Sequence, residues 1–145
     1  MEDLESYLDA IAEPTIKDFE DNPTSVRHAF LACVEVFHGI DYSAYARRRP
    51  AILRQKFRKQ SSAFELVDDV AHALKHVTAG NREKPNLKAD EVISRPPAYY
   101  NKSGAWNLSR WGDPVGGVTL DGDRHVDLLE VVKAARDFLR TMAKP

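Results

Sequence analysis

The stretch from Ser61 to Thr78 carries the strongest helix signals in the chain. Ser62 and Glu65 have the spacing of a capping box, in which each side chain accepts a hydrogen bond from a free backbone N–H at the helix start. Apolar residues then recur at steps of three and four, the period of one buried helical face. They are Ala63, Val67, Val70, Ala71, Leu74 and Val77. The sequence therefore predicts an amphipathic helix here.

The opposite arc of this helix is polar. At about 100° per residue it holds Glu65, Asp68, Asp69, His72, Lys75 and His76. Two imidazoles one turn apart beside carboxylates are the groups that acid–base catalysis requires, so Asp69, His72 and His76 are candidate catalytic residues. The alternative is a solvated face whose carboxylate–His and carboxylate–Lys pairs each contribute about 0.3 kcal/mol.

Length and composition are those of one globular domain, which we take to span residues 1–145. A chain of 145 residues buries roughly 68–70% of its unfolded surface. Its 43% hydrophobic and 30% charged residues are ordinary for a globular protein. The formal net charge of -1 predicts no overall attraction to nucleic acid or to a membrane.

The sequence shows no signal for export. One cysteine, Cys33, excludes an internal disulfide, fits a reducing compartment and lies on an apolar helical stripe, which favours burial. The amino terminus, MEDLESYLDAIAE, is acidic and lacks the basic start and apolar run of a signal peptide. No apolar stretch approaches the roughly 18 residues that cross a bilayer. We therefore expect a cytoplasmic protein.

Two helical regions precede the central stretch. Residues 2–21 predict one helix, or two short helices broken near Pro14. Asn22 and Pro23 suit the N-cap and the first position of a helix that runs to about Tyr45. Because this second helix is apolar on most sides, we expect it to lie at the centre of a bundle.

The remaining elements differ on the two sides of the central stretch. Pro50 suits the first turn of a third helix. Prolines and glycines make a continuous helix implausible over residues 79–126, where a loop and a hairpin are expected instead. Residues 91–94 predict a short strand, and residues 118–126 a tight hairpin with Asp-Gly at a type I′ turn. Residues 127–143 predict a last helix with a capping-box start.

Two short motifs raise the possibility of a metal site. Glu35 and His38 form an E-x-x-H pair, and Asp69 and His72 have the related D-x-x-H spacing on another helix. Such pairs supply ligands in di-iron carboxylate bundles. The full pattern needs two E-x-x-H motifs plus lone glutamates from two further helices, and we do not find that set. The alternative is that His38 is partly buried and hydrogen-bonded.

The strongest electrostatic feature is a basic segment. Between Tyr42 and Phe64 there are seven basic residues and no acidic one. Such a patch can bind polyanions even when the whole chain is nearly neutral. The alternatives are pairing with the acidic first helix or with a second subunit. The candidate nucleic-acid-binding residues are Arg47, Arg48, Arg49, Arg54, Lys56, Arg58 and Lys59.

Aromatic residues are interleaved with cations in the predicted loop. Aromatic side chains beside cations can stack on bases, although they more often anchor a long loop to a helical core. The residues concerned are Tyr99, Tyr100, Lys102, Trp106, Arg110 and Trp111.

The run from Ala71 to His76 reads A-x-x-x-Lys-His. It resembles a segment of small uncharacterised bacterial proteins that carry this motif near the end of a bundle helix. A bundle followed by a hairpin and a closing helix also resembles the broad HEPN-like class, which is linked to RNA cleavage and defence systems. The resemblance, over residues 23–78, implies a helical module that acts on or beside nucleic acid. The Arg that catalytic members carry four to six residues before a His is absent near His38, His72 and His76.

The predicted fold is mainly α, an antiparallel bundle of four to five helices with a small β-hairpin before the C-terminal helix. Three functions are compatible with the sequence. The first is a HEPN-like module that contacts nucleic acid or another polyanion through the basic patch, without a cofactor. The second is a helical protein that binds a divalent metal ion through Glu35, His38, Asp69 and His72. The third is a non-catalytic interaction module, and a homo-oligomer is compatible with each.

Overall fold

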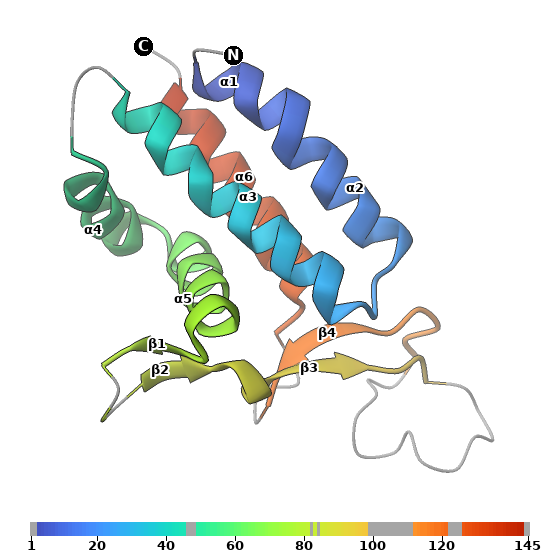
Figure 1. Ribbon diagram of the computed structural model, residues 1–145. Coiled ribbons are helices and arrows are strands. Elements are labelled where there is room, and N and C mark those ends of the chain that lie inside the picture. The colour runs from blue at the N-terminus through green and yellow to red at the C-terminus, as the bar shows by residue number, and fades with distance from the viewer. Residues whose placement is uncertain are drawn as a thin grey trace.

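The computed structural model describes residues 3–45, 49–81, 83, 85–98, 112–121 and 126–143. The mainly α prediction is confirmed (Figure 1). The helical elements are α1 (Leu4–Tyr7), a π-helical turn (Leu8–Ala12), α2 (Glu13–Asp21), α3 (Val26–Ala44), α4 (Pro50–Gln60), α5 (Ser62–His76) and α6 (Leu128–Ala143). The first three form one rod beside α3 and α6, whereas α4 lies at the side of the bundle and packs against α3 and α5 (Figure 1).

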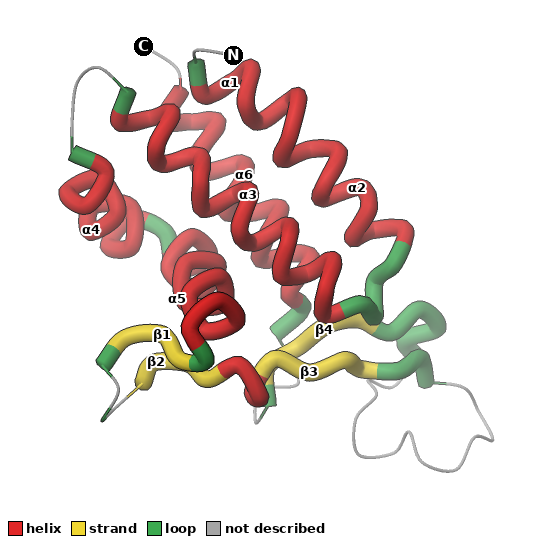
Figure 2. Tube along the Cα trace, in the orientation of Figure 1, coloured by secondary structure: helices red, strands yellow, loops and turns green. Residues whose placement is uncertain are grey.

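Two short antiparallel strand pairs lie across one end of the bundle (Figure 2). The pairs are β1 (Thr78–Gly80) with β2 (Pro85–Lys88), and β3 (Val92–Arg95) with β4 (Gly117–Leu120). The predicted strand and the small hairpin element before α6 are confirmed, but the partner differs. Val92 of β3 faces Leu120 of β4, so the strand partner of β4 is β3, and the contact of β4 with Val126 is a hydrogen bond from the Thr119 hydroxyl to the Val126 carbonyl at 2.6 Å. The rest of the predicted Asp-Gly turn lies outside the described residues.

Two helix starts differ from the sequence prediction. Asn22 ends α2, and the N-cap of α3 is Ser25, whose hydroxyl accepts a hydrogen bond from the His28 amide at 3.3 Å. The N-cap of α5 is Ser61, which accepts from the Phe64 amide at 3.1 Å, one residue before the predicted Ser62. An N-cap needs an extended backbone, and Ser61, with φ of -141°, has one.

The helical rod continues through Pro14 without a break. Proline lacks the N–H that an α-helix needs, and the turn before it is widened into the π-helical turn. Thr15 donates its hydroxyl to the carbonyl of Ile11 at 2.8 Å. The predicted break is therefore replaced by a local change of helical pitch.

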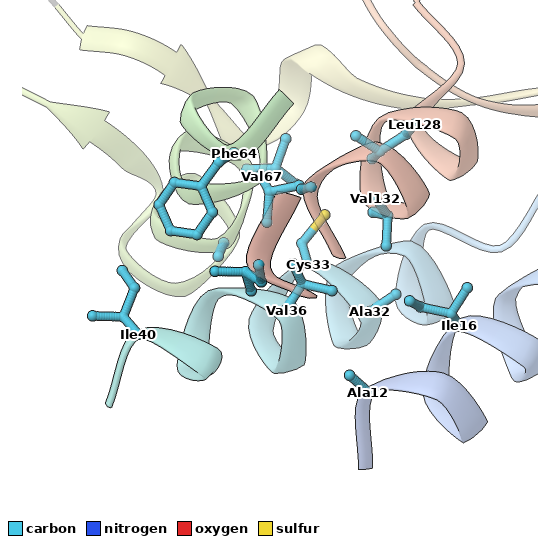
Figure 3. Close-up of a cluster of buried hydrophobic side chains, with 14 of the residues drawn as sticks. Ala12, Ile16, Ala32, Cys33, Val36, Ile40, Phe64, Val67, Leu128 and Val132 are labelled. Atoms are coloured by element: carbon cyan, nitrogen blue, oxygen red, sulfur yellow. The ribbon is translucent and has the colours of Figure 1, made fainter. Parts of the chain in front are cut away.

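The core is formed by apolar faces of the rod, α3, α5 and α6. Cys33 lies among Val36, Val67 and Val132 (Figure 3). Its burial is confirmed, and the loss of solvation raises the pKa of its thiol, which makes it unreactive. None of the described helices has an apolar stretch long enough to span a bilayer.

Aromatic contacts attach α4 to the bundle. The ring of Phe57 on α4 meets that of Phe64 on α5 edge-on, with centroids 5.6 Å apart. It meets the ring of Phe138 on α6 in the same way at 5.3 Å. Leu53, one turn earlier, is also buried. These apolar residues fix which side of α4 faces inward, and therefore which of its cations face solvent.

Candidate functional site

The candidate site lies where α4 turns back onto α5. Ser61 is both the C-cap of α4 and the N-cap of α5, so side chains one or two turns on either side of it face each other. Arg54 and Arg58, one turn apart on α4, face Asp68 on α5. The short connection therefore brings two cations and a carboxylate together within fifteen positions of sequence.

Asp68 is the centre of this cluster and is fully buried. Its Oδ2 accepts hydrogen bonds from Arg54 Nε at 2.8 Å and from Arg58 Nη1 at 2.6 Å. The Nδ1 atom of His72 lies 2.9 Å from both the carbonyl oxygen and Oδ1 of Asp68. The His72 Nδ1 atom is hydrogen-bonded to the carbonyl oxygen of Asp68, and Oδ1 of Asp68 has no hydrogen bond within the described part of the chain. A buried carboxylate is costly unless it is paired, and the two arginines provide that pairing.

Arg58 is neutralised by its neighbours. Besides Asp68 it pairs with Glu65 at 3.0 Å and with Asp69 at 2.9 Å. Burial alone would lower the pKa of the Arg58 guanidinium, but the hydrogen bonds to Asp69 and Asp68 outweigh it and raise the pKa. Arg58 therefore serves the α4–α5 contact and offers little positive charge to a ligand.

The imidazoles lie on the solvent side of this cluster. The ring of Phe37 on α3 meets His72 edge-on at 5.0 Å, and the rings of His72 and His76 are 6.1 Å apart. His76 is exposed, whereas His72 is half-buried. His38 is exposed and makes no hydrogen bond with any described residue, so the alternative of a partly buried, hydrogen-bonded His38 is wrong.

The predicted catalytic set is rearranged around a different carboxylate. Asp69 accepts from Arg58, and His72 instead contacts Asp68, four residues before it. The sequence placed Asp68 on the solvated arc, which is wrong because α4 covers that part of α5. The i,i+4 spacing of Asp68 and His72 was the available signal. A catalytic role for Asp69, His72 and His76 stays a prediction.

The basic patch is divided between the two sides of α4. Arg54 and Arg58 lie on the side of α4 that faces α5 and pair with Asp68, while Arg49, Lys56 and Lys59 are exposed and have no ion pair with a described residue. At 100° per residue, the two lysines lie roughly 140–200° around the helix from Arg54. Arg47 and Arg48 lie outside the described residues. The outward side of α4 is therefore the part of the patch that can meet a polyanion.

The acidic first helix does not neutralise this surface. Its carboxylates pair with α6 instead: Glu13 contacts Arg136 at 2.9 Å and Arg140 at 2.9 Å. Residues 49–76 hold six basic side chains and three carboxylates, which leaves a formal charge of +3. All three carboxylates bind Arg58. The positive charge of α4 therefore faces solvent.

The alternative metal ligands are not brought together. Among the described residues, no three histidine, cysteine or acidic side chains lie close enough to hold a metal ion. Glu35 accepts a hydrogen bond from the Tyr7 hydroxyl at 2.6 Å, on the side of α3 that faces the rod. Desolvation and this bond raise the pKa of Tyr7. Asp69 is taken by Arg58.

A second charged cluster lies at the strand end of the bundle. Arg95 of β3 is fully buried and donates Nη1 to Asp113, while Nη2 lies 3.5 Å from Asp127. Burial would raise the pKa of Asp113, but Arg95 and the amides of Val115 and Gly116 lower it below 3.8. A cavity of about 360 Å³ adjoins the cluster, lined by Glu20, Pro23, Gly112, Asp113, Val115, Gly116, Gly117, Asp127 and Leu129. The cluster joins β3, β4 and the start of α6.

No family model matches the chain, and neither a curated protein nor a solved structure matches it. The interleaved aromatics and cations of residues 99–111 lie outside the described residues.

Proposed function

We propose that the outward side of α4 binds a polyanion, and that its ligand is single-stranded nucleic acid. One observation carries the proposal: some cations of α4 have a carboxylate partner in the described chain, and others have none. The two arginines on the side of α4 that faces α5 are held by carboxylates, whereas Arg49, Lys56 and Lys59 have no such partner in the described chain. Exposed cations that release counterions from phosphates are the main source of affinity for nucleic acid.

Two exposed side chains, one at the end of α3 and one on α4, favour a single strand over a duplex. Tyr45, at the end of α3, is 69% exposed, and Ile52, on the outward side of α4, is 61% exposed. Unpaired bases can stack on an aromatic ring and contact an aliphatic one, whereas the bases of a duplex are stacked on each other. An acidic protein surface would use the cations but would not need the tyrosine.

The test is a fluorescence-anisotropy titration of the full chain with a labelled oligouridine at a series of salt concentrations. Contact with three phosphates predicts a slope of about -2 for log K against log[salt]. Replacing both lysines, Lys56→Gln with Lys59→Gln, should reduce the magnitude of that slope by about 1.4. Affinity should fall alike for all sequences, because phosphate contacts carry no base information.

A matched control separates this surface from general charge. Lys17→Gln with Arg27→Gln removes two exposed cations from α2 and from the start of α3, away from α4. This pair should leave the salt slope nearly unchanged. Absence of binding at low salt, or equal losses in both double variants, would contradict the proposal. Tyr45→Ala should weaken binding of the single strand more than binding of a duplex.

The other predictions are consistent with this surface and stay predictions. The resemblance to the HEPN-like class is supported by the bundle and by the Ala71–His76 motif on α5. The cytoplasmic location is supported by the buried, unpaired Cys33. A homo-oligomer would be detected by light scattering with and without the oligonucleotide.

A further inference from the structure

Arg54 differs from the other cations of α4 in how it is held. Its Nε atom donates to Asp68 at 2.8 Å, and its guanidinium carbon lies 5.7 Å from the centre of the Phe37 ring. Neither terminal nitrogen, Nη1 or Nη2, makes a hydrogen bond with a described residue. Arg58 contrasts with this, because both of its terminal nitrogens are occupied by carboxylates.

The anchoring leaves a fixed fork that faces solvent. Asp68 is fully buried, whereas the side chain of Arg54 is 37% exposed. Contact with a carboxylate at Nε and with an aromatic face restricts a side chain that otherwise loses about 2 kcal/mol of rotamer entropy on binding. The two free N–H groups of such a fork match two oxygens of a carboxylate or a phosphate.

The neighbouring groups favour a phosphate over a carboxylate. Arg54 and His72 share two neighbours, because each contacts both the Phe37 ring and the Asp68 carboxylate. The His72 Nδ1 atom is used by Asp68, which leaves Nε2 free, and the His76 ring lies beside it. A carboxylate has two oxygens, which would accept hydrogen bonds from the two N–H groups of the fork and leave no oxygen for the imidazole. A phosphate monoester has three terminal oxygens, and the third can meet the imidazole edge.

We propose that Arg54, supported by Phe37 and Asp68 and bordered by His72, forms a recognition site for one phosphoryl group, a phosphate monoester. The site is separate from the outward surface, because Lys56 and Lys59 lie on the other side of α4. The phosphoryl group can come from a small phosphorylated molecule or from the 5′-phosphate of a nucleic-acid strand. The interaction is non-covalent, and Arg54 donates both hydrogen bonds.

The test uses phenyl phosphate and benzoate as probes, followed by 1H–15N correlation spectra of the full chain. Phenyl phosphate should shift the amide resonances of residues around Arg54 and His72. Benzoate should bind at least tenfold more weakly than phenyl phosphate. Arg54→Lys keeps the positive charge but loses the guanidinium fork, so it should weaken the binding of phenyl phosphate at least tenfold. Arg27→Lys makes the same change at an exposed arginine of α3, outside both proposed binding sites, and should alter affinity less than twofold. Arg54→Gln, which keeps a neutral donor for Asp68, is a second variant and should also lose the site.

A second comparison distinguishes the sources of the phosphate. If an oligouridine with a 5′-phosphate binds more tightly than its 5′-hydroxyl form, and Arg54→Lys removes the difference, the strand terminus is the ligand. If phenyl phosphate binds but the two oligouridines do not differ, the ligand is a small phosphorylated molecule. Equal binding of benzoate and phenyl phosphate, or equal effects of Arg54→Lys and Arg27→Lys, would overturn the proposal. These tests of the Arg54 site do not depend on the outcome for Lys56→Gln with Lys59→Gln, which tests the outward surface.

Discussion

Replacing the buried carboxylate of Asp68 should destabilise the fold more than any other single charge change in the α4–α5 cluster. Asp68→Asn keeps the shape but removes the charge that faces Arg54 and Arg58. Breaking a buried ion pair by removing one partner costs about 3–5 kcal/mol. The cost should be lower here, because both guanidiniums reach solvent and Arg58 keeps Asp69. We therefore expect a loss of about 2 kcal/mol in the free energy of unfolding.

Urea and thermal denaturation followed by circular dichroism measure this loss. For a domain of this size, about 2 kcal/mol corresponds to a decrease in Tm of about 4–8 °C. Glu65→Gln is the control, because it removes a carboxylate that is 49% exposed and binds the same Arg58. An exposed pair contributes about 0.2–1 kcal/mol, so this variant should stay close to the wild type. Equal stability of the two variants would refute the argument that burial of Asp68 sets its energetic role.

Three further outcomes can be measured by the same denaturation methods. Val77 is 72% exposed and has a φ of 72°, a conformation that costs a β-branched residue about 1–2 kcal/mol. Val77→Gly should therefore stabilise the fold by about 0.5 kcal/mol, despite the larger entropy of glycine in the unfolded chain. A loss of stability would contradict this. Asp113 has a lowered pKa, so its stabilisation is present above about pH 4 and is lost as the pH falls below that value. Asp113→Asn should be less stable at neutral pH, because it leaves buried Arg95 with a weaker partner, and its stability should fall less steeply with acid. His72→Ala should cost about 1–2 kcal/mol, whereas His76→Ala should stay within about 0.5 kcal/mol; similar losses would mean that the contact of His72 with Asp68 does not stabilise the fold.

The helices could be predicted from the sequence because each has an apolar stripe of the right period. The bundle needs every such stripe to be covered, which also places the longest and most apolar helix, α3, at its centre. The prediction of the helix ends was less accurate than the prediction of the helices themselves. Ser61 and Ser62 are both good N-caps, and only the backbone, which is extended at Ser61, distinguishes them.

The candidate site could be predicted only in part, for a reason that Asp68 illustrates. A helical wheel gives each residue a direction but does not say how many neighbours the helix has. Because α4 packs on the polar side of α5, a residue on the predicted solvated arc becomes fully buried. The same contact turns two of the seven predicted phosphate-binding residues, Arg54 and Arg58, away from the outward surface. Val77 fails in the opposite sense, since the helix ends before its apolar position reaches the core.

Asp68 also allows the two physical accounts of the Arg54 site to be separated by the sign of one effect. If the site binds phosphate through its electric field, removing a nearby negative charge in Asp68→Asn should strengthen phenyl phosphate binding. If the site binds through a fork that Asp68 holds in place, the same substitution should weaken binding, because Arg54 must then be ordered at the moment of binding. A loss of about 2 kcal/mol leaves a domain of typical stability folded, so the measurement is possible. Weaker binding in a variant that has gained positive charge would therefore support positioning by Asp68, and stronger binding would exclude it.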